Sequence, residues 1–178
     1  AWWEELYVRL PELPDDDEVA GQYAYAADKL SKLGFERYEV SNFCKRGKES
    51  RHNLNYWRRG EYIGFGVSAS SCINNVRFTN TFDLDEYFKC ILSDNFAVID
   101  SEKIDENGQK EEYIMLALRT ASGINLSEYR ANFGVGFEEE YADTLAKLAP
   151  FFEKKNGRVF IRPEHLYEQN SIIIKFLK

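Results

Sequence analysis

Helical and strand-like hydrophobic patterns alternate along the first part of the chain. Asp15 and Glu18 have the spacing of a capping box, and the apolar positions after them recur at helical spacing, which predicts a helix that ends at Gly34. The aromatic and β-branched run 35–43 predicts a strand, and the apolar run 62–73 predicts a second one. A helix, a glycine and a strand in this order are typical of one unit of an α/β layer.

Beyond about residue 80 the pattern favours helices. One apolar stripe covers 84–92 and another covers 113–120, where a helix is expected to continue until the chain reaches a glycine. Shorter helices are expected at 127–133 and 137–149. The change of pattern predicts a second, mostly helical unit, so the fold class is expected to be α/β followed by α+β.

Near the C-terminus the sequence predicts a β-hairpin and then a helix. Asn156-Gly157 separates two runs of aromatic and β-branched residues within 151–161, and this dipeptide is a strong signal for a tight two-residue turn. Pro163 suits the first position of a last helix. Helices followed by a hairpin indicate a winged-helix-like unit.

The composition predicts a folded protein and indicates where in the cell it is found. The 178 residues are 44% hydrophobic and 15% aromatic, which is enough apolar surface for one full domain or two small ones. No run approaches the ~18 apolar residues of a transmembrane helix, and the first residues lack the regions of a signal peptide. We therefore expect a cytoplasmic protein without an integral membrane segment. Because the chain starts with Ala1 rather than Met, the native polypeptide is expected to be longer.

The cysteines predict neither a metal site nor a redox pair. Cys44, Cys72 and Cys90 are spaced too widely for a zinc ribbon or a C-x-x-C motif. We interpret them as reduced thiols, so no metal is expected in this part of the protein.

Charge is distributed unevenly. The net charge of −7 disfavours general binding to nucleic acid or to an anionic membrane, and the acidic C-terminal half argues against DNA as the partner of a winged helix. Segment 45–59, in contrast, has six basic side chains against one acidic side chain. It is expected to be a loop at a strand end, where it would bind anions.

Residues 64–69 match the G-x-G-x-x-A pattern of a dinucleotide site. We reject that interpretation because residues 70–75 are not a helix start that could hold a pyrophosphate. Two explanations stay open for Gly64 and Gly66: a close approach of the backbone to a ligand, or a bulge in a strand.

Residues 51–57 place an imidazole, two amides and two large aromatic rings in the basic segment. His52 is a candidate general acid, a metal or haem ligand, or a hydrogen-bonded structural histidine. Tyr56 and Trp57 either stack on a planar ligand or cap the core. The sequence alone leaves these alternatives open.

Three motifs resemble one known family. They are Tyr-Glu-Val-Ser-Asn-Phe at 38–43, Arg-His-Asn-Leu-Asn-Tyr-Trp at 51–57 and Gly-Glu-Tyr-Ile-Gly-Phe-Gly at 60–66. They resemble the oxygen-independent coproporphyrinogen III oxidase-like radical S-adenosylmethionine (SAM) proteins, with the haem-chaperone branch nearest, and the resemblance covers essentially the whole chain.

The resemblance implies a domain organisation. Residues 1–78 would form the C-terminal edge of a partial (β/α) radical SAM barrel, and residues 79–178 would form the C-terminal domain with the hairpin 151–161. Family members carry an upstream C-x-x-x-C-x-x-C motif that holds a four-iron four-sulfur (4Fe-4S) cluster, to which SAM binds. This chain lacks that motif, so it is expected to be inactive by itself, whereas the intact protein would resemble a radical SAM oxidoreductase.

The resemblance also implies site residues. Candidates for contact with SAM are His52, Asn53, Gly64, Gly66, Ser68, Ala69 and Ser70. Many relatives have histidine where this chain has Ser70, so a role that needs an imidazole there is not carried over. Our own candidates for contact with a porphyrin ring or its propionates are Arg51, Tyr56, Trp57 and Arg58.

The function expected from the resemblance is haem binding and delivery to a recipient protein. The enzymatic alternative is oxidative decarboxylation of coproporphyrinogen III to protoporphyrinogen IX. A third, unrelated alternative is a non-catalytic winged-helix interaction module. Since an incomplete barrel exposes strand edges, a homodimer is also expected to be possible.

Overall fold

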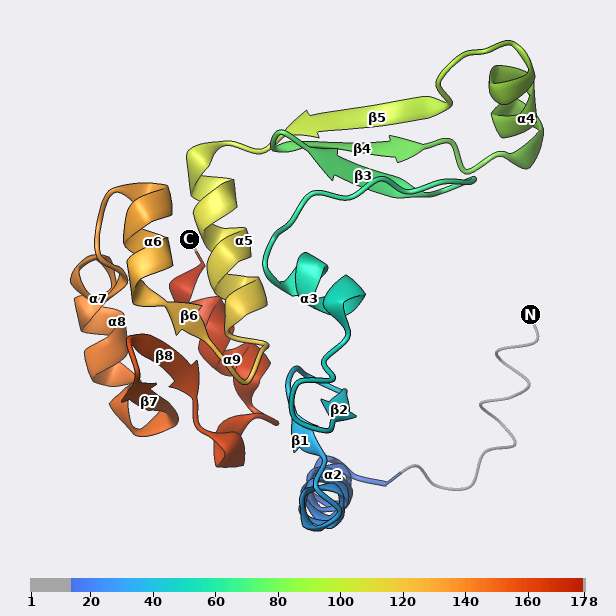
Figure 1. Cartoon of the computed structure of the whole chain (residues 1–178). Coiled ribbons are helices and arrows are strands. Elements are labelled where there is room, and N and C mark those ends of the chain that lie inside the picture. The colour runs from blue at the N-terminus through green and yellow to red at the C-terminus, as the bar shows by residue number, and fades with distance from the viewer. Residues whose placement is uncertain (1–13, 178) are drawn as a thin grey trace.

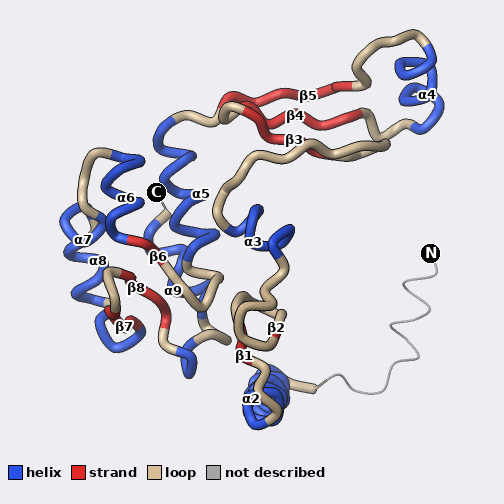
Figure 2. Tube along the Cα trace, in the orientation of Figure 1, coloured by secondary structure: helices blue, strands red, loops and turns tan. Residues whose placement is uncertain are grey.

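The computed structural model describes residues 14–177. Figure 1 shows a compact C-terminal body, a sheet that extends from it as an arm, and a helix near the start of the described chain. Figure 2 shows that helices dominate the body and strands dominate the arm. This mixture of helices and strands agrees with the expected α/β and α+β class. Among residues 14–177, no helix is long and apolar enough to cross a membrane.

Helix α2 (Asp16–Lys32) confirms the predicted capping box, in which Glu18 N donates to Asp15 Oδ1 over 2.8 Å. The single strand predicted for 35–43 is wrong. Two short strands, β1 (Glu36–Arg37) and β2 (Phe43–Cys44), pair antiparallel instead, because the chain reverses direction where Tyr38 N donates to Asn42 O over 3.2 Å.

The basic segment is partly helical. Helix α3 (Arg51–Trp57) begins after Ser50, whose Oγ accepts a hydrogen bond from Asn53 N over 3.3 Å. The loop prediction is therefore wrong for 51–57, because the N-cap serine satisfies a backbone donor of the first turn and stabilises a helix. Only 45–50 and the residues just after Trp57 stay non-helical.

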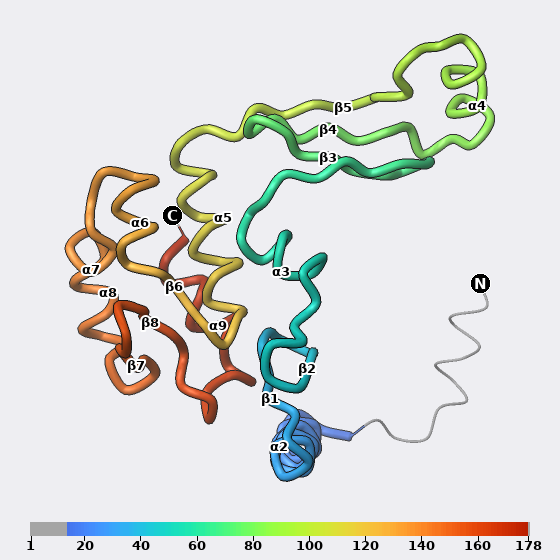
Figure 3. The backbone as a smooth tube through the Cα atoms, viewed as in Figure 1, coloured from blue at the N-terminus to red at the C-terminus, as the bar shows by residue number. Residues whose placement is uncertain are grey.

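The arm contains three antiparallel strands, β3 (Ser70–Ile73), β4 (Val76–Asn80) and β5 (Val98–Lys103). Helix α4 (Leu84–Leu92), which the apolar stripe predicts, connects β4 to β5 at the far end of the arm (Figure 3). The strand predicted for 62–73 is confirmed only from residue 70, since Tyr62 makes an isolated bridge to Cys72. Residues 78 and 79, the expected domain boundary, both lie in β4.

The C-terminal body contains most of the buried apolar side chains. Its elements are α5 (Glu106–Ala117), β6 (Ile124–Asn125), α6 (Leu126–Phe133), α7 (Phe137–Glu140), α8 (Ala142–Lys147), β7 (Phe152–Lys155), β8 (Arg158–Ile161) and α9 (Gln169–Ile173). The side chains with the least exposure are Ile114, Leu118, Ile124, Tyr129, Phe137 and Phe176. Burial of this aromatic and aliphatic cluster supplies the main hydrophobic stabilisation of the body.

The predicted hairpin is confirmed in this body. Asn156 and Gly157 both have positive φ, 52° and 71°, as a tight turn between β7 and β8 requires. The helix expected from Pro163 is interrupted, because a 3-10 turn at Pro163–His165 precedes α9. The helix expected at 137–149 is likewise divided, with Tyr141 between α7 and α8.

Candidate functional site

Helix α3 displays an exposed aromatic row. His52 and Tyr56 are one helical turn apart, and their rings meet edge to face with centroids 4.9 Å apart. The Tyr56 ring is in turn 5.0 Å from that of Tyr62. His52 and Tyr56 are exposed, and among residues 14–177 no hydrogen bond from the His52 imidazole is present. We call His52, Tyr56 and Tyr62 the aromatic row; it leaves the imidazole accessible to a ligand.

The opposite face of α3 points towards the C-terminal body. Leu54, Trp57 and Arg58 line a small cavity of about 190 Å³ together with Tyr113 of α5 and Arg158 of β8. The structure therefore separates two candidates that the sequence placed side by side: Tyr56 lies in the aromatic row, whereas Trp57 lines the cavity between α3 and the C-terminal body. Arg58 is exposed and lies at the edge of this cavity.

An ionic network fixes the end of α3. Arg59 Nε donates to Glu112 Oε2 over 2.8 Å, and Arg59 Nη1 donates to Asn75 Oδ1 over 2.8 Å. Arg77 of β4 also donates to Glu112, and this hydrogen bond raises the pKa of Arg77. Glu112 thus joins α3, the arm and α5. Sequence analysis missed it, because Glu112 is far from both arginines along the chain and no local pattern marks it.

Polar and charged residues precede and accompany the aromatic row along the chain. Arg51 is exposed on the first turn of α3, and Lys45, Arg46 and Lys48 are exposed on the preceding loop. Asn53 is half-buried, and its backbone N–H donates a hydrogen bond to Oγ of the N-cap residue Ser50. The exposed cations favour an anionic ligand, as the charge of the segment predicts.

The contacts of the glycine-rich segment 64–69 are made with other parts of the same chain. A side chain at Gly64 would collide with the Ser70 carbonyl, and Gly66 has a φ of 113° while its carbonyl accepts from Asn80 Nδ2 over 2.9 Å. Both glycines are therefore explained by close approach and turn geometry within the protein. The structure also agrees with our rejection of a dinucleotide site, because a strand and not a helix follows the segment.

The remaining candidates of this segment lie beside β4. Ser68 has a φ of 61°, and its N–H donates to Thr81 O over 2.8 Å. Ala69 N donates to Gly66 O over 3.4 Å, and Ser70 Oγ lies 3.1 Å from Thr79 Oγ1. Ser68 and Ser70 are exposed, whereas Ala69 is half-buried.

None of the three cysteines is paired in a disulfide. Cys44, Cys72 and Cys90 are all free thiols. Within residues 14–177, no group of three or more His, Cys, Asp or Glu side chains is placed to hold a metal ion.

Comparison with known proteins finds a matching family model and several similar proteins. Residues 104–166 match the HemN C-terminal domain. The chain is 35% identical to the haem chaperone HemW of Lactococcus lactis over 167 residues, which are 93% of this chain and 44% of that protein. It is 31% identical to the haem chaperone HemW of Bacillus subtilis over 137 residues, 77% of this chain and 36% of that protein. The chain thus spans less than half the length of these relatives.

A solved structure has the same fold. The coproporphyrinogen III oxidase HemN of Escherichia coli, a radical SAM enzyme, superposes with a TM-score of 0.70 at 15% sequence identity. The match covers 93% of this chain and 42% of the HemN chain. At this identity the likeness establishes the fold.

Proposed function

The chain belongs to the HemN/HemW-type family, and from this premise we propose that it is part of a haem chaperone that binds haem at the aromatic row of α3. The intact protein would then deliver the haem to a recipient protein in the cytoplasm. The names of the relatives support haem binding, and the exposed aromatic row of α3 supports the choice of this site.

The exposed His52 imidazole is the observation that carries the proposal. Histidine is a common axial ligand of haem iron, and neither ring nitrogen of His52 is engaged by another described residue. Tyr56 and Tyr62 extend the row and supply apolar ring surface for a planar macrocycle. Arg51, Arg46 and Lys48 are exposed on or just before the first turn of α3 and would supply the positive charge for propionates.

The site is open enough for release as well as binding. His52 and Tyr56 are exposed on a short helix, so a bound haem would keep one face accessible to a recipient protein. The Arg59–Glu112 ion pair fixes the end of α3, and Trp57 lines the cavity towards the C-terminal body, so neither occupies the aromatic row. An exposed site on a fixed helix suits a carrier that passes its cargo on.

We also propose that the intact protein contains a 4Fe-4S cluster and SAM in a radical SAM barrel, with residues 1–78 at its closing edge and 79–178 as the C-terminal domain. The described residues do not provide a cluster ligand set. Near the glycine-rich segment, the N–H groups of Ser68 and Ala69 donate within the chain, whereas the side chains of Ser68 and Ser70 are exposed and accessible to SAM. No step of haem binding at α3 depends on these groups.

A haem titration followed by the Soret absorbance tests the proposal. We expect saturable binding by this chain and a loss of affinity of about tenfold or more in His52→Ala, because the substitution removes the iron ligand. His165→Ala is the matched control, since His165 pairs with Glu168 and packs against Phe151 on the C-terminal body. Equal affinity of the wild type and His52→Ala would overturn the proposal.

A further inference from the structure

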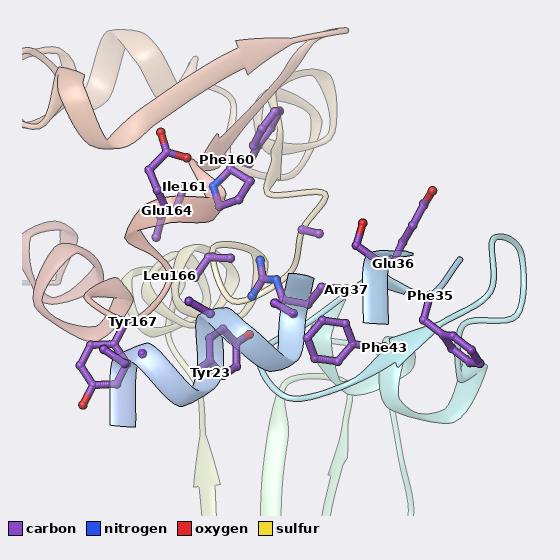
Figure 4. Close-up of a pocket in the computed structure, with 17 residues that line it drawn as sticks. Tyr23, Phe35, Glu36, Arg37, Phe43, Phe160, Ile161, Glu164, Leu166 and Tyr167 are labelled. Atoms are coloured by element: carbon purple, nitrogen blue, oxygen red, sulfur yellow. The ribbon is translucent and has the colours of Figure 1, made fainter. Parts of the chain in front are cut away.

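A second cavity lies on the far side of the molecule from the arm. It has a volume of about 650 Å³ and is lined mainly by α2, the β1–β2 pair and the end of β8 with the segment that follows it (Figure 4). Apolar side chains from all three parts form its walls, among them Ala24, Ala27, Phe43, Ile161 and Leu166. Its size falls within the ~300–1,000 Å³ of typical small-molecule sites.

One cation interrupts this apolar lining. Arg37 of β1 extends between Leu166 and the rings of Tyr23 and Phe43, as Figure 4 shows. Its Nη1 atom is buried and has no hydrogen-bond partner among the described residues. Burial lowers the pKa of Arg37, but a guanidinium stays protonated at neutral pH.

A buried donor without an acceptor is costly, more so when it is charged. The hydroxyl of the neighbouring Tyr23 donates to Val40 O over 2.9 Å. This hydroxyl and the buried Glu39 carboxylate both favour the charged form of Arg37, which partly offsets the lowering of its pKa by burial. The carboxylates that line the cavity, Glu36 and Glu164, belong to exposed residues at its rim. The Nη1 atom itself still has no acceptor in the described part of the chain, and the space beside Arg37 is lined mostly by apolar side chains.

We propose that this cavity binds a small amphipathic monocarboxylate, whose carboxylate pairs with Arg37 and whose apolar body fills the space between α2 and the C-terminal body. The two acidic residues at the rim would repel a ligand with several negative charges, so a single carboxylate suits the site best. Among the described residues that line it, none is a histidine, cysteine or methionine. This lining distinguishes the cavity from the proposed haem site at His52.

Calorimetric titration of the chain with decanoate tests the inference, with decanol as the uncharged isostere. We expect decanoate to bind at one site and at least about tenfold more tightly than decanol, as a charge-assisted hydrogen bond to Arg37 requires. Arg37→Met is expected to abolish this preference, and Arg37→Lys, which keeps the cation, is expected to retain part of it. Arg46→Met is the matched control, because Arg46 is exposed and does not line the cavity.

A cavity-filling variant separates this site from exposed apolar surface elsewhere. Ala27→Phe adds a ring to the wall of the cavity and leaves Arg37 in place. We expect it to weaken decanoate binding about tenfold or more while the far-ultraviolet circular dichroism spectrum stays unchanged. Equal affinity for decanoate and decanol, or unchanged decanoate affinity in both Arg37→Met and Ala27→Phe, would overturn the inference.

Discussion

Arg59, just beyond the end of α3, donates its Nε–H to Glu112 of α5 over 2.8 Å, with both side chains only 18% exposed. The bond joins residues that are distant along the chain and holds the base of the aromatic row against the C-terminal body. Since Arg77 of the arm shares the same carboxylate, one acidic side chain supports three parts of the molecule.

Replacing Glu112 therefore tests how α3 is positioned. Glu112→Gln keeps the shape of the side chain but leaves the largely buried Arg59 guanidinium without its counter-charge, and it removes one of the two carboxylates that pair with Arg77. We expect it to lower the free energy of unfolding by about 3 kcal/mol, as breaking a buried ion pair from one side does. Urea-induced unfolding followed by tryptophan fluorescence measures the change.

Glu102→Gln is the matched control for this prediction. Glu102 also pairs with Arg77, but at 3.7 Å and with a side chain that is 68% exposed. We expect a change of no more than about 0.5 kcal/mol, because solvent screens such pairs. Equal effects of the two substitutions would show that burial of the Glu112 network does not stabilise the fold.

Two glycines with positive φ should differ in their tolerance of a side chain. Gly157 lies in the β7–β8 turn with open space around its Cα, whereas a Cβ at Gly123 would collide with the backbone of β8. We expect Gly157→Ala to destabilise the protein by about 1 kcal/mol through its φ alone. Gly123→Ala should cost about 1–3 kcal/mol more, because β8 must also move. Chemical denaturation of both variants ranks the two positions, and a larger loss at Gly157 would contradict the packing around Gly123.

Stability should fall at alkaline pH because of a buried tyrosine. Burial raises the pKa of Tyr113 from 10.0 to about 12. Above pH 10 the unfolded chain loses this proton while the folded chain keeps it, so the stabilisation present below pH 10 is lost progressively until the pH passes the folded value. We expect a loss of up to about 2 kcal/mol from Tyr113 between pH 10 and pH 12.

Urea unfolding at intervals from pH 8 to pH 12 measures this dependence. Tyr113→Phe should flatten the part of the curve that Tyr113 causes, whereas Tyr25→Phe, at a position 65% exposed, should leave the curve unchanged. A curve that has the same slope in Tyr113→Phe as in the wild type would contradict the account. Tyr129, whose pKa is also raised by burial and by its bond to Glu140, adds to the slope in all three proteins.

Local chemistry made part of the fold predictable from the sequence. The capping box at Asp15 and the Asn156-Gly157 turn act within a few residues, and the structure confirms both. The pattern did not reveal β5, because its six residues are all exposed and carry no apolar alternation. The strand expected from 35–43 failed for a related reason: a strand needs a partner, and hydrophobicity does not say where the chain turns back.

The sequence singled out residues 51–57 by their composition but could not give the geometry of the candidate site. A loop would have let His52, Tyr56 and Trp57 converge on one ligand, whereas in the helix Trp57 lines the cavity towards the C-terminal body. The orphaned Nη1 of Arg37 and the cavity around it depend on the docking of α2 near residues 160–167. The spacing of residues within a single segment cannot predict a site that distant segments form together.

Chemical rescue of His52→Gly measures the central claim most directly. The substitution removes the imidazole from the aromatic row, and free imidazole added to the solution can occupy the vacated place beside Tyr56. We predict that His52→Gly binds haem at least about tenfold more weakly than the wild type, and that added imidazole restores both the affinity and the position of the Soret band. Haem affinity that is unchanged by the substitution, or a loss that imidazole does not restore, would contradict ligation by His52.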